Sequence, residues 1–127
     1  MERIQQLVTN KSVILVGNSV ELMHYNHGKF IDSHDIVVRF GRAVDTIADD
    51  KGKQLGSKTD IWVTGQFRAP IYKKRKEEFK TGRFKDTEIL LNRCRGNFRI
   101  KNWILEEHIP KDMPYTQMWT DAELEEL

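Results

Sequence analysis

Small polar residues directly after an apolar run carry the most specific chemical signal in this chain. Gly17, Asn18 and Ser19 follow the run Val13–Val16, and a glycine that leaves the end of a buried strand lets backbone amides approach an anionic group. The Asn18 amide and the Ser19 hydroxyl can each donate and accept hydrogen bonds, which suits phosphate or ribose oxygens. The pattern predicts an anion-binding turn. A strand-to-helix turn with a serine cap is the alternative.

A second group of polar residues, Asp32, Ser33, His34 and Asp35, precedes another apolar run. Two carboxylates around an imidazole could serve a catalytic pair or a metal site. Asp, Ser and His side chains before a strand more often bind the amides of a turn. We therefore interpret this box as support for a neighbouring site, with direct catalysis as the alternative.

Histidines and basic residues supply two weaker signals. His24 and His27 have a spacing that could ligate zinc, but no cysteine or acidic residue stands at a convincing distance along the chain. We expect loop histidines exposed to solvent and no metal. The basic segment, residues 68–85, could attract nucleic-acid phosphates. A solvated helix face is the preferred interpretation of this segment, because its aromatic residues are better explained as core than as a stacking platform.

Length and composition indicate one compact domain. The chain has 127 residues, of which 39% are hydrophobic, and a domain of that size can bury a real core. Its net charge of +2 conceals a basic middle part, since residues 66–101 carry 12 basic and 4 acidic side chains. One cysteine, Cys94, cannot form an internal disulfide, and no run resembles a signal peptide or a membrane span. We expect a cytoplasmic protein.

Alternating strands and helices should position these residues. We expect strands at residues 13–16, 36–40, 60–64, 88–92 and 115–119, and helices at 1–11, 70–80 and 97–108, with a short helical piece at 21–25 and a capping box at Thr120 and Glu123. Residues 42–58 read as a solvent-facing loop. The first run is continuously apolar, which predicts a central strand. The order predicts an α/β fold with a mostly parallel sheet of about five strands flanked by helices.

Four short motifs in this order, VGNS, IDSHD, VVRF and GSKTD, resemble the large sialylmotif of glycosyltransferase family 29, the sialyltransferases. The resemblance covers about residues 13–63. It implies a modified, Rossmann-like glycosyltransferase A fold that binds the cytidine monophosphate (CMP) part of a donor sugar nucleotide without a metal. The nucleotide-binding residues would then be Gly17, Asn18, Ser19 and Gly41, and Asp32–Asp35 would support the site.

The chain also departs from the family pattern. Gly41 stands where family members commonly have an asparagine that helps to hold the nucleotide, and Val13 replaces a cysteine of the secreted-pathway members, so a microbial or viral relative fits better. The family's later motifs, which contain the histidine base, have no counterpart before Leu127. We therefore expect one domain, residues 1–127, that binds a sugar nucleotide but lacks the catalytic part, so the catalytic residues are unknown.

Three functions remain open from the sequence. The preferred one is a sialyltransferase-like domain whose partners are a CMP-sugar donor and a glycan acceptor. The alternatives are a glycosyltransferase that uses another sugar nucleotide, and a non-catalytic module that binds nucleic acid or protein through residues 68–85.

Overall fold

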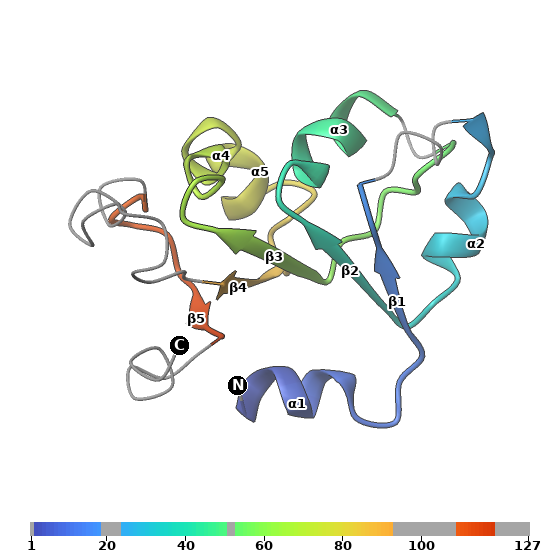
Figure 1. The fold of residues 1–127 in the computed structure, drawn as a ribbon, viewed down its shortest axis with the longest axis horizontal. Coiled ribbons are helices and arrows are strands. Elements are labelled where there is room, and N and C mark those ends of the chain that lie inside the picture. The colour runs from blue at the N-terminus through green and yellow to red at the C-terminus, as the bar shows by residue number, and fades with distance from the viewer. Residues whose placement is uncertain (1, 19–23, 51–52, 93–108, 119–127) are drawn as a thin grey trace, which may run out of the picture.

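The computed structural model describes residues 2–18, 24–50, 53–92 and 109–118, and these form one parallel sheet with helices on both faces. The sheet follows chain order, with β1 (Val13–Val16), β2 (Ile36–Phe40), β3 (Ile61–Gly65), β4 (Glu88–Asn92) and β5 (Thr116–Gln117) side by side (Figure 1). All four pairings are parallel. The predicted α/β fold with about five strands is thus confirmed.

The helices form two unequal layers. One face of the sheet carries α2 (Gly28–Asp32), α3 (Ala43–Asp50), α4 (Pro70–Lys74) and α5 (Lys76–Lys80), and α1 (Glu2–Val8) lies across the other (Figure 1). Successive crossovers advance in one direction across the sheet, and right-handed crossovers of that kind place their helices on the same face. Among the described residues, no helix is both long and apolar enough to pass through a bilayer.

Alternate residues of each strand face the two layers. Trp62 is fully buried on the α3 to α5 side, where its ring centroid lies 5.3 Å from that of Phe79 and its Nε1 donates to the Gly41 carbonyl oxygen at 2.8 Å. On the opposite side, Ile4 of α1 packs in a cluster with Val38 and Ile61. Trp62 therefore packs between the sheet and its helices, and its indole also fixes the end of β2.

Two expectations about local structure are wrong. Residues 43–50 of the predicted loop form α3, because Ala43, Val44 and Ile47 make a narrow apolar face that is buried against the sheet. The helix predicted at 70–80 is divided at Arg75 into α4 and α5. Pro70 does occupy the first turn of α4, as expected.

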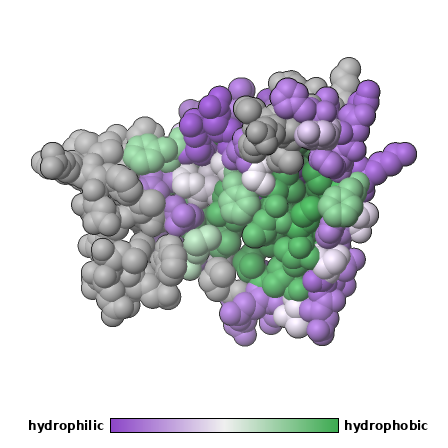
Figure 2. All heavy atoms as spheres, turned by 45° about the vertical axis from the view of Figure 1, so that its right-hand side comes forward, coloured by the Kyte–Doolittle hydropathy of each residue, from purple (hydrophilic) through white to green (hydrophobic). Residues whose placement is uncertain are grey.

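The position of β1 also differs from the prediction of a central strand. Within the described residues β1 pairs only with β2, so it is an edge strand. Leu15 is 66% exposed, and Val13 and Phe30 are exposed beside it. Figure 2 shows the continuous hydrophobic area that results on this side of the molecule. An apolar run of four residues reads the same at the centre and at the edge of a sheet.

Several predicted features lie outside the described residues. These are residues 21–23 of the helical piece predicted at 21–25, the helix at 97–108 with Cys94 before it, and the capping box at Thr120 and Glu123.

Candidate functional site

The carboxyl ends of the first three strands meet at one edge of the sheet and are tied together there. Asn18 follows β1, and its Nδ2 donates to the carbonyl oxygen of Phe40, the last residue of β2, at 3.0 Å. The amide of Gly41 donates to the carbonyl oxygen of Val63 in β3 at 2.8 Å. The structure therefore brings Gly17, Asn18 and Gly41 together, while Ser19 lies outside the described residues. This is the edge at which open α/β sheets bind ligands.

At this edge Gly17 leaves its backbone open, whereas Gly41 is half-buried with its amide and its carbonyl oxygen both hydrogen-bonded. A Cβ placed on Gly17 would meet no atom within 4 Å, so the turn opens to solvent. Gly41 has a φ of +51°, a left-handed backbone that glycine adopts freely and that asparagine tolerates better than most residues. Glycine at position 41 is therefore as compatible with this backbone as the asparagine that the resemblance leads one to expect there.

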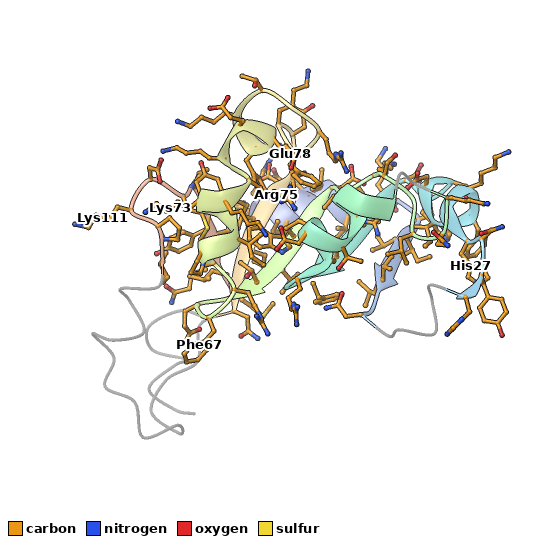
Figure 3. The ribbon with its side chains drawn as sticks, turned by 90° about the horizontal axis from the view of Figure 1, so that it is seen from above. His27, Phe67, Lys73, Arg75, Glu78 and Lys111 are labelled. Atoms are coloured by element: carbon orange, nitrogen blue, oxygen red, sulfur yellow. The ribbon has the colours of Figure 1, made fainter. Side chains whose placement is uncertain are left out.

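Phe67 and Arg68 lie at the exit of β3, and the sequence did not predict that they belong to the site. The amides of Arg68 and Ala69 both donate to the carbonyl oxygen of Gly65, at 3.1 and 3.0 Å, which closes a tight turn. Gln66 and Ala69 are buried in this turn, whereas Phe67 is 52% exposed and Arg68 is exposed. Figure 3 shows Phe67 projecting from the end of β3. The signal for these residues was their position directly after a strand.

A shallow apolar groove adjoins the same corner. Its volume is about 230 Å³, and it runs from Gly17 along the outer side of β1 to α2. His27 borders it, and Figure 3 places this residue at the end of the molecule farthest from the α4 helix. The lining residues are Ile14, Leu15, Val16, Gly17, His27, Phe30 and Ile31. The corner beside Gly17 is thus hollowed rather than filled by packed side chains.

The acidic box lies at the amino ends of the strands, opposite to the corner at Gly17 and Gly41. Asp32–Asp35 precede β2, and β2 and β3 run parallel. The Asp32 carboxylate accepts hydrogen bonds from the amides of Ser57 and Lys58 at 2.9 and 3.0 Å. In return, the Lys58 Nζ donates to the carbonyl oxygens of His34 and Asp35, each at 2.7 Å. The box therefore joins the loop before β2 to the loop before β3.

Gly56 and Arg39 complete this junction. Gly56 has a φ of +74°, and a Cβ there would lie 2.4 Å from Asp32 Oδ1, so only glycine fits. Arg39 is 1% exposed, and its Nε donates to the Lys58 carbonyl oxygen and to Thr59 Oγ1 at 2.9 and 3.0 Å. Lys58 and Thr59, which belong to the GSKTD motif, therefore shape the entry to β3.

His34 and Asp35 make local contacts at the same edge. His34 Nδ1 lies 3.0 Å from the Phe30 carbonyl oxygen, which holds the ring against the end of α2. The Ser12 amide donates to Asp35 at 3.0 Å, and this hydrogen bond holds the pKa of the Asp35 carboxyl below its ordinary value. Ser33 donates its hydroxyl to the Phe30 carbonyl oxygen at 2.6 Å. These contacts orient the backbone before β2. They can therefore support the corner at Gly17 and Gly41 only indirectly, through β2.

Half of the basic side chains in residues 68–85 are paired with carboxylates within the fold. Asp45 of α3 binds Arg75 at 2.7 Å and Lys74 at 3.5 Å, and Arg83 lies 3.6 Å from Glu78. In Figure 3, Arg75 and Glu78 lie beside each other in the helix layer. Cations that are paired with carboxylates offer little field to a nucleic acid. The segment instead holds α3, α4 and α5 together.

Metal-ligating side chains do not cluster in the described part of the chain. Over residues 2–18, 24–50, 53–92 and 109–118, no group of three or more His, Cys, Asp or Glu side chains could hold a metal ion. His24 and His27 are exposed there, and His27 makes a ring contact with Tyr25 at 5.6 Å.

Comparison with known proteins identifies the family of the chain. No protein of curated function matches the chain. The family model for glycosyltransferase family 29 (sialyltransferase) matches residues 5–124, which is nearly the whole chain and far more than the region of the four motifs. The chain therefore belongs to glycosyltransferase family 29, the sialyltransferases.

Proposed function

We propose that the chain binds the nucleotide of a CMP-sugar at the carboxyl edge formed by Gly17, Asn18 and Gly41, as part of the transfer of a sialyl group to a glycan hydroxyl. The observation that carries the proposal is the hydrogen bond from Asn18 to the end of β2. It joins the exits of β1 and β2 into one corner, at which the Gly17 backbone is open to solvent. Membership of the family supplies the class of donor and acceptor.

The chemistry of the reaction explains why such a site is useful. During transfer, the bond between the anomeric carbon of the sugar and a phosphate oxygen of CMP breaks, and that oxygen keeps the electron pair. The acceptor oxygen forms the new bond and gives up its proton to a base. Backbone amides and cations at the strand exits stabilise the negative charge that grows on the departing phosphate. This stabilisation needs no metal, so we propose a metal-independent site.

The base remains outside the proposal. None of the described histidines is assigned to this role, and a positioned base typically contributes about 10² to 10⁴ in rate. Binding of the nucleotide is therefore the property to test.

Thermal unfolding with CMP tests the proposal. A ligand that binds only the folded chain raises its stability by about 2.7 kcal/mol at a concentration 100 times its Kd. We expect CMP to raise the unfolding temperature and Asn18→Ala to remove that shift. The variant also loses the 3.0 Å bond to Phe40, so each shift is measured against the same protein without ligand.

Two further outcomes of this experiment separate the alternatives. A larger shift with uridine or guanosine nucleotides would favour another donor. No shift with CMP up to millimolar concentration would remove the proposal.

A further inference from the structure

We infer that Arg68 is the residue that pairs with the phosphate of the bound nucleotide, an inference that rests on the proposed function. Arg68 lies at the exit of β3, next to the exit of β2. Its Cγ stands 3.8 Å from the position that a Cβ on Gly41 would take. The stem of Arg68 therefore lies beside Gly41, in van der Waals contact with the position that a Cβ would take.

The turn that carries Arg68 is rigid, which directs the side chain to this space. Two hydrogen bonds to the Gly65 carbonyl oxygen close the turn. Ala69 is fully buried and Gln66 is 1% exposed, so the residues on both sides of Phe67 and Arg68 are anchored in the core. A fixed backbone with an exposed arginine suits a binding residue, because less conformational freedom is lost when the ligand arrives.

The charge of Arg68 is available to a ligand. Within the described residues its guanidinium has no hydrogen-bond or ion-pair partner, unlike Arg75 and Arg83 of the same basic segment. The nearest described acidic residue of α3, Asp45, is already bound to Lys74 and Arg75. A cation that is not neutralised within the fold attracts an anion more strongly.

The chemistry of the guanidinium fits a phosphate better than a base or a ribose. Arginine presents several N–H groups in one plane and binds phosphate oxygens in pairs. The open backbone at Gly17 allows a phosphate to come close to the same corner, and the lack of a side chain at Gly41 leaves room beside the stem of Arg68. Arg42, the chain neighbour of Gly41, is also exposed at this edge, and its carbonyl oxygen accepts hydrogen bonds from the amides of Asp45 and Thr46 at the start of α3.

Titration calorimetry with CMP and with cytidine tests the inference, because cytidine lacks the phosphate. We expect Arg68→Met to weaken CMP binding about 10- to 100-fold, which is the usual effect of losing hydrogen bonds to a charged group. Cytidine binding should stay the same. Arg68→Gln is a second variant that keeps polarity but not charge, and it should behave like Arg68→Met.

Lys85→Met is the matched control, because it removes one exposed cation at the opposite edge of the sheet, before β4. It should bind CMP as the unaltered chain does. Unfolding temperatures of all variants are measured without ligand, and we expect them to be equal because Arg68 is exposed.

Each other result speaks against the inference in its own way. If the unaltered chain binds CMP and Arg68→Met binds it equally well, Arg68 is not the phosphate ligand while the proposed function stands. Equal losses of CMP and cytidine would show a structural role. Loss only in Arg42→Met would assign the phosphate to that residue. Failure of the unaltered chain to bind CMP would defeat both proposals.

Discussion

Replacing Gly56 by alanine should damage the fold more than any other glycine substitution at the junction of the two loops. The residue has a φ of +74°, and an added Cβ would lie 2.4 Å from Asp32 Oδ1 and 3.0 Å from the Gly28 carbonyl oxygen. Real Cβ atoms do not approach so closely, so the Asp32 carboxylate has to move. When it moves, it leaves the amides of Ser57 and Lys58.

The cost has two parts that the structure allows us to separate. A left-handed backbone costs alanine about 1 to 2 kcal/mol relative to glycine. Each hydrogen bond from a backbone amide to the Asp32 carboxylate contributes about 1.5 kcal/mol. We take a value at the lower end of the range because the Asp32 side chain is 31% exposed, so water can take the place of the carboxylate. The sum is about 4 kcal/mol, a large part of the 5 to 15 kcal/mol that holds an ordinary domain together.

Thermal and urea unfolding followed by circular dichroism measure this cost. With about 3 to 5 °C per kcal/mol for a chain of this size, Gly56→Ala should unfold about 12 to 20 °C lower. In the background of Asp32→Ala the carboxylate is gone, so the same substitution should cost only about 1 to 2 kcal/mol. Gly17→Ala is the control, since its Cβ meets nothing within 4 Å. Additive costs, or a loss below about 1 kcal/mol in Gly56→Ala, would refute the reasoning.

Three further predictions follow from other contacts. The Ser12 amide lowers the pKa of Asp35, so this group contributes stability that is present above about pH 4 and is lost as the pH falls through the lowered pKa; Asp35→Asn should flatten the acid side of a curve of unfolding temperature against pH, and an unchanged curve would contradict this. Leu15→Lys should reduce self-association in light scattering without lowering the unfolding temperature, because Leu15 is 66% exposed on an uncharged edge strand; equal association by both proteins would argue against the edge as its cause. Arg75→Gln should cost about 1 to 2 kcal/mol in urea unfolding, since its 2.7 Å bond to Asp45 joins α4 to α3; a neutral effect would mean that the packing of the helices suffices.

The strands could be predicted from the sequence because each is a short run of apolar residues with a turn at its end. Val13–Val16, Ile36–Phe40 and Glu88–Asn92 have the expected bounds. The order of the strands within the sheet could not be predicted in this way, because whether a strand is central or at the edge depends on which segments lie next to it. The edge position of β1 is decided by tertiary contacts that no local pattern contains.

The helix α3 was missed for a related reason. Its sequence has many charges and two glycines after it, which are typical of a loop. Three residues, Ala43, Val44 and Ile47, are enough to bury one face of a helix of eight residues. Asp45 of this helix is bound to Lys74 and Arg75, so a charged, loop-like composition is compatible with a short helix.

For the site, the order of residues along the chain predicts which residues meet better than the composition does. In a parallel sheet, residues that follow a strand lie at the opposite edge from residues that precede one. Asp32–Asp35 precede β2, and residues 57–60 precede β3, so the two groups meet and bind each other. Gly41 follows β2 and Arg68 follows β3, so they meet at the other edge. Changes in the first set should therefore act on binding through the stability of the sheet, whereas changes in the second set act on the ligand directly.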